Sequence, residues 1–425
     1  MKYKMGITYY FFLLFIVTQI STAQFSPHFQ NYTLSDYNAG NHNWDISKSE
    51  SGKLYVANDN GLLEFDGLIW KLWQLPNKTT IRSVLAFNDK IYTGSYEDFG
   101  YWEKDGKGNL KYYSLSELIG EKEFLNEEFW QIILHKKSLV FRSFLNIYKY
   151  ENEKIEIIKT PSTVMSCDIV IGEIYISTLK NGVFILKDKK LIPITSSKIL
   201  ENTKVISIVN YDDVFLMSTA LKGCFIYKND IVIPWEAEIS QYIKQYQLNN
   251  FLKLDNGNMV FGTIKNGVYI TDYNGKILFH ISKENGLANN TVLGVYSDSN
   301  DLLWLDLDNG IASIDLNSNY SFYNDVSGKL GAVYDVIEYN DVNHIGSNTG
   351  LYFLDKENKL QFIEGSQGQV WYLEEIKGEL FCGHNNGTYI IDRNRLKLIS
   401  GYTGGWVIKK APEQSNVLYK VLILV

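Results

Sequence analysis

The sequence predicts an all-β protein made of four-stranded β-propeller blades, and three observations lead to this prediction. Apolar runs of about four to six residues alternate with polar turns, a length that suits strands and is too short for helices. Pairs such as Asn-Gly separate consecutive runs and suit tight two-residue turns. The turn glycines recur about every 40 residues, which is typical of propeller blades.

Glycines that follow one turn of each unit mark the repeat. They stand at positions 182, 223, 267, 310, 350 and 387, so the successive steps are 41, 44, 43, 40 and 37 residues. A tenth unit begins at Gly404 and stops. Nine units precede it, with inner-strand segments near Trp44, Ile81, Phe129, Val164, Val205, Phe251, Val292, Val333 and Val370.

This number of units predicts more than one ring, because propellers usually close with about 4–8 blades. We expect a first propeller of seven blades over residues 24–327 and the opening blades of a second, truncated propeller over residues 328–425. Helix is expected at Glu236–Tyr246, as an insertion between blades five and six, and more weakly at Ser114–Ile119.

The composition supports an ordered, strand-rich protein. The chain has 425 residues, of which 45% are hydrophobic, enough to build cores and to exclude intrinsic disorder as the main state. Its 30 Tyr, 22 Phe and 9 Trp favour strands. The 41 basic and 48 acidic residues give a net charge of −7, which argues against a nucleic-acid-binding surface.

The first 23 residues have the pattern of a cleaved secretory signal peptide. Lys2 and Lys4 form a positive start, and residues 7–20 are almost entirely apolar. Small residues at 21–23 then precede Gln24. The alternative is an uncleaved membrane anchor, but the apolar run is short of the roughly 20 residues that span a bilayer. We therefore expect a periplasmic or secreted protein, with no membrane span after cleavage.

The first two units share several segments with a known family. On them the chain resembles the periplasmic sensor region of two-component regulator propeller proteins of the Bacteroidetes type, which include hybrid two-component and LuxR-type triple-tyrosine regulators. The segments are Asn43–Ile46, Gly52–Asn58 and Gly61–Gly67 in the first unit, and Ile81–Val84, Ile91–Tyr96 and Phe99–Trp102 in the second.

The resemblance implies a sensor. Proteins of that family have two seven-bladed propellers, a triple-tyrosine β-sandwich, a membrane helix and a cytoplasmic output part, either a histidine kinase with a response regulator or a helix-turn-helix. Here Trp406–Pro412 resembles a blade start, but Lys420–Val425 does not continue it. We therefore expect a truncated, frameshifted or fragmentary product that lacks the membrane and output parts.

No catalytic, metal or cofactor motif stands out in the sequence. There is no GxSxG nucleophile elbow, no HExxH motif and no phosphate-binding loop, and the six histidines lack ligand spacing. Asp306–Gly310 echoes a calcium loop without its later glutamate, so a hairpin turn is the better interpretation. Cys167, Cys224 and Cys382 are too few for a disulfide framework and are expected to be buried thiols.

Six residues at or near inner-strand starts are candidates for ligand binding on a propeller face. Tryptophan rings stack on sugars, and Arg or Asn side chains bind hydroxyls and carboxylates. The alternative is that the tryptophans are wedges between blades. The six residues are Trp44, Arg82, Trp130, Asn249, Asn289 and Trp371.

Two functions stay open at this point. The first is a non-enzymatic, exported sensor module, with a small glycan or another periplasmic ligand as partner and with self-association through an exposed blade. The second is a secreted enzyme or adhesion module that acts on glycans, since fold alone cannot decide between them. A paired carboxylate or a metal cluster on one propeller face would favour the second.

Export predicts a defined mature N-terminus. We expect intact-mass and peptide mass spectrometry of the protein from its native host to find Gln24, or its cyclised form, as the first residue, because the small residues at 21–23 suit signal peptidase. A cytoplasmic protein that retains Met1 would contradict this prediction.

Overall fold

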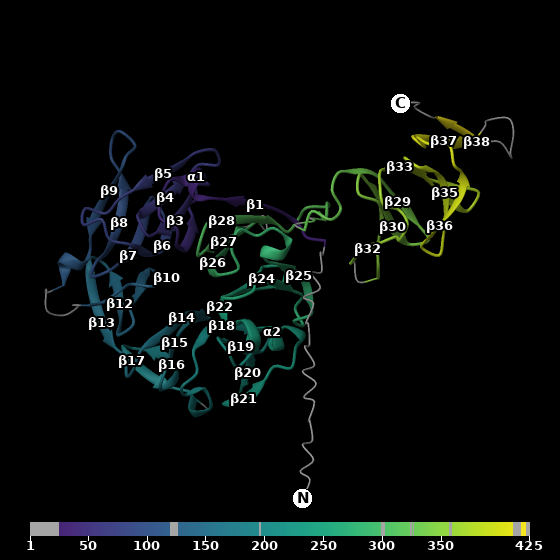
Figure 1. Cartoon of the computed structure of the whole chain (residues 1–425). Helices are drawn as coiled ribbons and strands as arrows, with labels where there is room; N and C mark the ends of the chain where they lie inside the picture. Colours follow the sequence, from purple (N-terminus) through teal and green to yellow (C-terminus); the bar gives the residue numbers. More distant parts are fainter. Residues whose placement is uncertain are drawn as a thin grey trace, which may run out of the picture. The chain divides into compact units, whose positions relative to one another are not determined.

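A computed structural model describes residues 25–119, 126–194, 197–298, 302–323, 325, 327–356, 359–410 and 418–421. The predicted signal peptide lies outside these residues. The chain divides into two compact units, one containing Gln24–Val326, here called the ring unit, and one containing Ser327–Val425, here called the C-terminal unit. Both are built almost entirely of β-strands (Figure 1).

The ring unit is a seven-bladed β-propeller, in which each blade is a four-stranded antiparallel sheet (Figure 1). Blades one to three are β2 (Asn43–Lys48), β3 (Leu54–Asn58), β4 (Gly61–Phe65) and β5 (Trp70–Trp73); β6 (Ile81–Phe87), β7 (Lys90–Ser95), β8 (Phe99–Lys104) and β9 (Leu110–Ser114); and β10 (Gln131–His135), β11 (Ser138–Arg142), β12 (Asn146–Glu151) and β13 (Lys154–Lys159).

Blades four to six follow the same order from the inner to the outer strand. They are β14 (Val164–Val170), β15 (Glu173–Thr178), β16 (Gly182–Lys187) and β17 (Lys190–Pro193); β18 (Val205–Tyr211), β19 (Val214–Thr219), β20 (Cys224–Lys228) and β21 (Ile231–Pro234); and β22 (Leu248–Lys253), β23 (Met259–Thr263), β24 (Val268–Thr271) and β25 (Ile277–Ile281).

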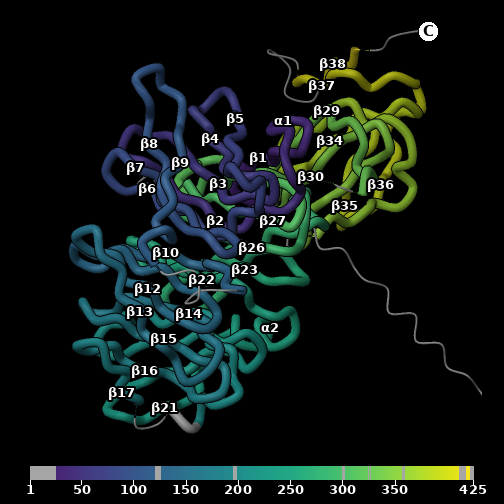
Figure 2. The backbone as a smooth tube through the Cα atoms, turned by 90° about the vertical axis from the view of Figure 1, so that its left-hand side faces the viewer, coloured from purple at the N-terminus to yellow at the C-terminus, as the bar shows by residue number. Residues whose placement is uncertain are grey.

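Blade seven takes its outer strand from the other end of the ring unit. Its inner strands are β26 (Val292–Ser297), β27 (Leu302–Leu307) and β28 (Ile311–Asp315), and β1 (His28–Tyr32) pairs antiparallel with β28. The Asn31 side chain adds two bonds, donating to the Gly286 carbonyl at 2.9 Å and accepting from the Ala288 amide at 3.0 Å. Figure 2 shows β1 beside the blade that it completes. The ring is therefore closed by strand pairing.

Apolar side chains fill the junctions between consecutive blades. Ile81 and Val84 of blade two lie in one buried cluster with Ala57 and Leu62 of blade one. At the closing junction, Ile46 of blade one packs in a cluster that includes Trp304 and Ile311 of blade seven. Each inner strand thus buries its first residues against the preceding blade.

Close backbone contact explains two of the turn glycines, Gly61 and Gly267. A Cβ atom at Gly61 would lie 2.2 Å from the carbonyl oxygen of Trp73, and one at Gly267 would lie 2.1 Å from that of Ile281. In both blades the third strand begins where the outer strand ends. No side chain fits there, and both glycines also have positive φ angles, which glycine adopts without strain.

Helix is scarce among the described residues. The longest is α2 (Glu238–Tyr246), which confirms the predicted helix, and it lies between β21 and β22 with Ile239 and Ile243 buried. Helix α1 (Leu34–Tyr37) is a single turn, and 3₁₀ turns cover Ser116–Leu118, Ser197–Leu200 and Lys283–Asn285. No helix within this described part of the chain is long and apolar enough to cross a membrane.

The C-terminal unit holds two further blades and a strand pair. Each blade is antiparallel and follows the ring-unit order. The blades are β29 (Val333–Tyr339), β30 (Val342–Ser347), β31 (Leu351–Leu354) and β32 (Leu360–Phe362); and β33 (Val370–Ile376), β34 (Glu379–His384), β35 (Gly387–Asp392) and β36 (Arg395–Ser400). The pair is β37 (Val407–Lys410) with β38 (Leu418–Val421).

The two units should differ in resistance to protease. The ring unit has no open blade face, whereas two blades and a strand pair cannot close on themselves, and open edges unfold locally. We expect limited proteolysis to cut the C-terminal unit first and to leave a folded core that ends between about residues 320 and 335. If residues 327–421 resist cleavage as well as residues 40–320 in a monodisperse monomer, this account is wrong.

Candidate functional site

A β-bulge at the start of the inner strand recurs from blade to blade. In blade two the register shifts between Ile81 and Ser83, so Arg82 is an extra residue without a partner on β7. Ile81 and Ser83 are fully buried, while Arg82 is partly exposed. A bulge redirects a side chain, and here it leaves Arg82 partly exposed between two buried neighbours.

The equivalent positions of the seven blades form a set that we call the mouth residues. Blade three lacks the register shift, and Trp130 directly precedes its inner strand. All seven are partly exposed. They are Trp44, Arg82, Trp130, Met165, Ile206, Asn249 and Leu293.

Three of the six sequence-predicted residues come together at this level. The guanidinium carbon of Arg82 lies 4.2 Å from the ring centroid of Trp44 and 4.8 Å from that of Trp130. Such cation–π contacts contribute about 0.5–2 kcal/mol each, depending on desolvation. The guanidinium uses few of its donors, since Nη2 lies 3.4 Å from Oε1 of Glu128 and the buried Nε has no hydrogen-bond partner.

Charged side chains extend this cluster toward blade seven. Nε1 of Trp44 donates to Asp59 at 2.9 Å, and Nδ1 of His42 lies 2.6 Å from the other oxygen of Asp59. Nε2 of His42 lies 3.3 Å from Asp308. The result, which we call the aromatic–charged arc, runs across blades seven, one, two and three. Its members are His42, Trp44, Asp59, Arg82, Glu128, Trp130 and Asp308.

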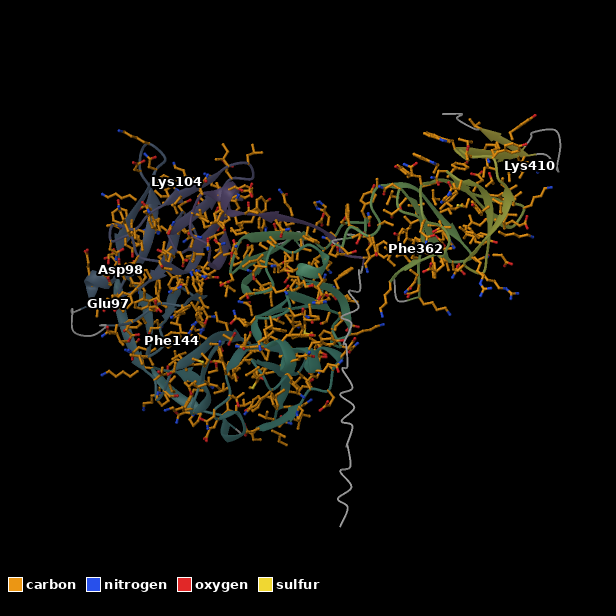
Figure 3. All side chains as sticks on the ribbon, viewed as in Figure 1. Glu97, Asp98, Lys104, Phe144, Phe362 and Lys410 are labelled. Carbon is orange, nitrogen blue, oxygen red and sulfur yellow. The ribbon has the colours of Figure 1, made fainter. Side chains whose placement is uncertain are left out.

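The aromatic faces in the arc are largely covered. Arg82 occupies one face of Trp44. The centroid of the His42 ring lies 5.3 Å from the centroid of the Trp44 ring. Phe144, labelled in Figure 3, lies 5.2 Å from Trp130. This favours the wedge interpretation of the two tryptophans, and it leaves the polar edges of the arc, rather than its rings, available to a ligand.

The remaining predicted residues lie apart from the arc. The Asn249 amide donates to the Val292 carbonyl of the next blade at 3.0 Å. Asn289 accepts from the Thr291 amide at 2.8 Å and so holds the turn before β26. Trp371 belongs to the C-terminal unit, where it stacks between Tyr334 and Trp406 with centroids 4.5 and 4.4 Å apart. In this arrangement both of its faces are covered.

Sequence reasoning missed a set of polar side chains that link inner strands. Oδ2 of Asp45 accepts from the Val84 amide of the next blade at 2.9 Å. Asp335 does the same with Leu373 at 2.7 Å, and Gln131 accepts from the corresponding amide of blade four at 3.1 Å. We call this contact the inter-blade latch. Its signal in the sequence is a polar residue one place after the bulge.

The closing junction lacks this latch. Gly294 stands at the latch position of blade seven, and Asp306 of β27 fills the vacant space, because a Cβ at Gly294 would lie 2.4 Å from its Oδ2. Asp306 is 0% exposed, and neither carboxylate oxygen has a hydrogen-bond partner. Burial, together with the nearby charge of Asp45, raises the pKa of Asp306 well above its ordinary value.

Burial also shifts the pKa values of charged side chains elsewhere in the blades. It raises the pKa of Asp45 to about 7 and that of Asp168 to about 6, and it lowers the pKa of Arg142 to about 10. Asp168 accepts hydrogen bonds from the hydroxyls of Ser166 and Ser207, at 2.7 and 3.0 Å. These groups act in contacts within and between blades.

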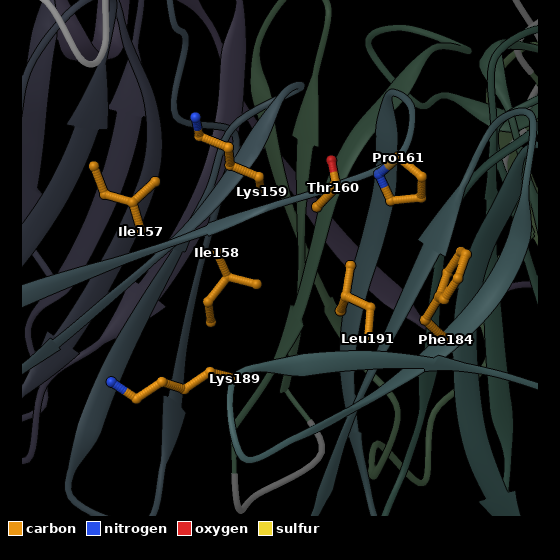
Figure 4. A pocket seen from close by; sticks show the side chains of 8 residues that line it. All are labelled: Ile157, Ile158, Lys159, Thr160, Pro161, Phe184, Lys189 and Leu191. Atoms are coloured by element: carbon orange, nitrogen blue, oxygen red, sulfur yellow. The ribbon is translucent and has the colours of Figure 1, made fainter.

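Two surface hollows lie elsewhere on the ring unit. One, of 470 Å³, opens where the outer strands of blades three and four diverge, and Figure 4 shows its lining of Ile157, Ile158, Lys159, Thr160, Pro161, Phe184, Lys189 and Leu191. The other, of 370 Å³, is lined by Thr33, Leu34, Ser35, Ala288 and Asn309. Neither includes a mouth residue.

Metal-binding and redox chemistry find little support in the described part of the chain. It contains no group of three or more His, Cys, Asp or Glu side chains that could hold a metal ion. Cys167, Cys224 and Cys382 are free and buried, which confirms the expected buried thiols. Burial raises the pKa of Cys224 and of Cys382 to about 12, so neither is a reactive thiolate at neutral pH.

Comparison with known proteins bears on the fold. No family model matches the chain, and no curated protein matches it in sequence. The chain is similar to the crystal structure of the extracellular domain of the putative one component system BT4673 from B. thetaiotaomicron, with 16% identity and a TM-score of 0.55 over 91% of this chain and 56% of that one. It is also similar to the extracellular domain of the putative hybrid two component system BT3049 from the same organism, with 15% identity and a TM-score of 0.54 over 88% of this chain and 60% of that one.

The fold is that of a β-propeller. These neighbours are the kind of protein that the opening blades resemble, and the chain spans little more than half of their length. Propellers of other functions also match, among them virginiamycin B lyase from Staphylococcus aureus, with 12% identity and a TM-score of 0.54 over 69% of this chain and all of that one. At such identities the likeness establishes the fold alone.

The buried carboxylates predict that stability falls as pH rises. A carboxyl whose pKa is raised on folding stabilises the fold below its unfolded pKa, near 3.9, and this contribution is lost as pH rises through the folded value. We expect the ring to lose about 1–3 kcal/mol of unfolding free energy between about pH 5 and pH 8. Thermal unfolding monitored by circular dichroism would measure it.

A single substitution tests how much Asp306, at the closing junction, contributes to this pH dependence. Asp306→Asn keeps the shape and removes the charge, so it should raise the melting temperature at pH 8 and change it little at pH 5. Asp89→Asn, at an exposed turn, serves as the matched control and should behave like the wild type. If the melting temperature of Asp306→Asn depends on pH as strongly as that of the wild type, ionisation of Asp306 does not cause the loss of stability.

Proposed function

We propose that this chain is the ligand-sensing propeller module of a transmembrane signalling or transcription regulator, exported through its N-terminal signal peptide. Three findings support the proposal. The first 23 residues have the signal-peptide pattern, and the opening blades resemble those of periplasmic sensors. Solved neighbours of the same fold are extracellular domains of one- and two-component systems.

The ligand binds at the aromatic–charged arc in this proposal. The observation that carries it is Arg82, which is fixed between Trp44 and Trp130 while it makes a single long hydrogen bond to Glu128. A side chain that is already immobilised loses little conformational entropy when a ligand binds. Its unused donors are therefore a prepared binding element.

The charges of the arc indicate the class of ligand. Arg82 and His42 stand against Asp59, Glu128 and Asp308, so the arc holds donors and acceptors without a positive excess. Such a mixture suits a neutral ligand rich in hydroxyl groups better than a strongly anionic one. A small, uncharged glycan breakdown product fits this description.

The second function, a secreted enzyme or adhesion module that acts on glycans, has a weaker basis. Carboxylates with pKa values raised toward neutrality occur at Asp45 and Asp168, and catalytic acids often show such values. Both accept hydrogen bonds that hold one blade to the next or to itself. These bonds account for the two residues without catalysis.

Isothermal titration calorimetry with a panel of neutral and acidic mono- and oligosaccharides tests the proposal. We expect a neutral sugar to bind the wild type, and Arg82→Gln to weaken it at least about tenfold, since a hydrogen bond from a charged donor contributes about 1.5–3 kcal/mol. Asp308→Asn, which leaves the Arg82 sandwich intact, should weaken binding several-fold.

Arg395→Gln, at an exposed position of the C-terminal unit, is the matched control and should bind like the wild type. If no sugar of the panel binds, or if the bound sugar is indifferent to both Arg82→Gln and Asp308→Asn, the arc is not the site. Chromatography of the same mixtures distinguishes the two functions, because a sensor leaves the sugar unchanged and an enzyme consumes it.

A further inference from the structure

The hairpin loops between the second and third strands of the blades flank the mouth residues. In blade four the Leu179 amide of this loop donates to the carbonyl of Thr163, which directly precedes the inner strand, at 2.8 Å. The same bond recurs in four other blades and fixes each loop beside the start of an inner strand. The pairs are Ala220 with Lys204 (2.9 Å), Ile264 with Gln247 (2.9 Å), Asp308 with Thr291 (3.1 Å) and Asp59 with His42 (3.3 Å).

The charge of these loops changes sign around the ring. In blades seven and one they carry Asp308 and Asp59, which belong to the aromatic–charged arc. In blades four to six each loop instead carries a lysine after an aliphatic residue, and a further lysine directly precedes the inner strand of blade five. Figure 1 shows blades four to six, β14 to β25, across the ring from blades one and two. We call these four lysines the lysine half of the mouth; they are Lys180, Lys204, Lys222 and Lys265.

The positive charge of the lysine half is not compensated by nearby acids. All four side chains are exposed, and in the described part of the chain none of them belongs to an ion pair. The acids of the arc are paired instead, Asp59 and Asp308 with His42. The mouth therefore has an excess of positive charge on one side, although the whole chain has a net charge of −7.

The lysine half continues directly from the end of the arc. The Trp130 amide donates to the Arg142 carbonyl at 2.8 Å on blade three. Burial, together with the positive charge of Arg142, lowers the pKa of Lys204 on blade five. Nζ of Lys222 donates to Oγ1 of Thr203, the residue before Lys204, at 2.7 Å. The cationic groups of blades three to five thus lie close enough to influence one another, and Lys222 is held in place.

We propose that the lysine half is a second subsite of the mouth, which binds an anionic substituent of the same oligosaccharide whose neutral part lies at the arc. The substituent is a carboxylate or a sulfate, because an ammonium group donates hydrogen bonds to the oxygens of either. This inference rests on the proposed function of the arc and adds the charge that the far end of the ligand carries. Since the two subsites lie on different blades, the ligand is an oligosaccharide rather than a monosaccharide.

An anion at the lysine half relieves a repulsion that the free protein contains. Lys204 and Arg142 carry like charges, and a negative group beside them favours both charged forms. A neutral hydroxyl group has no such effect. Lys222 is already fixed by its bond to Thr203, so its side chain loses little conformational entropy when the anion binds.

Calorimetry with matched sugars tests the proposal on the full chain. Each neutral oligosaccharide of the panel is compared with the two forms in which a terminal hydroxymethyl group is oxidised to a carboxylate or esterified with sulfate. We expect one or both anionic forms to bind at least about fivefold more tightly than the neutral form, because each exposed ion pair adds up to about fivefold. This gain should shrink at about 0.5 M NaCl, where exposed charges are screened.

A double variant tests whether the lysine half causes the gain. In Lys204→Gln/Lys222→Gln the ratio of anionic to neutral affinity should fall at least about threefold, since two of the four charges are removed. Lys187→Gln/Lys190→Gln is the matched control, because both lysines are exposed on outer strands of blade four and the change in net charge is the same. It should keep the ratio of the wild type. Circular dichroism should show unchanged folding in both variants.

Two outcomes overturn this inference alone. One is a wild type that binds a neutral sugar and gains nothing from either anionic group, which leaves the arc as the binding site. The other is a Lys204→Gln/Lys222→Gln variant that keeps the full gain, because the anionic group then binds elsewhere. If no form of any sugar binds, the proposed function fails together with this inference.

Discussion

Burial of each inner strand against the blade before it is the constraint on which the rest of this structure depends. Full burial of a Val, Leu or Ile side chain contributes about 1.5–3 kcal/mol, and a single blade has no second layer to provide it. The ring unit meets the constraint at every junction, including the last, where β1 completes blade seven and Ile46 packs against Trp304. Within the C-terminal unit, Val370 and Leu373 pack in the same way against Leu351 of the blade before them.

The same constraint positions the candidate site. In most blades a bulge sets one residue apart at the start of the inner strand, so that its flanking residues stay buried in the junction while it remains partly exposed. Three adjacent blades place Trp44, Arg82 and Trp130 at this position, and their side chains stack from blade to blade. In the C-terminal unit the same position gives the stack that contains Trp371. The residue at this one repeat position therefore packs against its neighbours in adjacent blades and also remains partly exposed at the candidate site.

Much of the fold could be predicted because its information is local. Turn glycines such as Gly267 and short apolar runs define a blade within about 40 residues, and α2 has the length and polarity of an insertion. The outer strand of blade seven could not be predicted in this way. His28–Tyr32 pairs with Ile311–Asp315, far along the chain, and nothing in the sequence of His28–Tyr32 indicates which strand it pairs with.

The site was predicted in part for a similar reason. The repeat placed Trp44, Arg82 and Trp130 at or near inner-strand starts, and the structure joins them. Asn289 shares the spacing but closes a local turn, a role that depends on backbone geometry rather than on repeat position. The sequence predicted a hairpin turn at Asp306–Gly310 but not the burial of Asp306, because that environment arises only when blade seven meets blade one and Gly294 leaves room for it.

Hydrogen exchange of β1 tests most directly whether the ring closes as described. If His28–Tyr32 is the outer strand of blade seven, its bonded amides should be protected as strongly as those of Ile311–Asp315, and both segments should exchange together as the ring unfolds. Rapid exchange of residues 28–32, as in a free terminus, while β26–β28 stay protected would contradict closure of the ring by this strand.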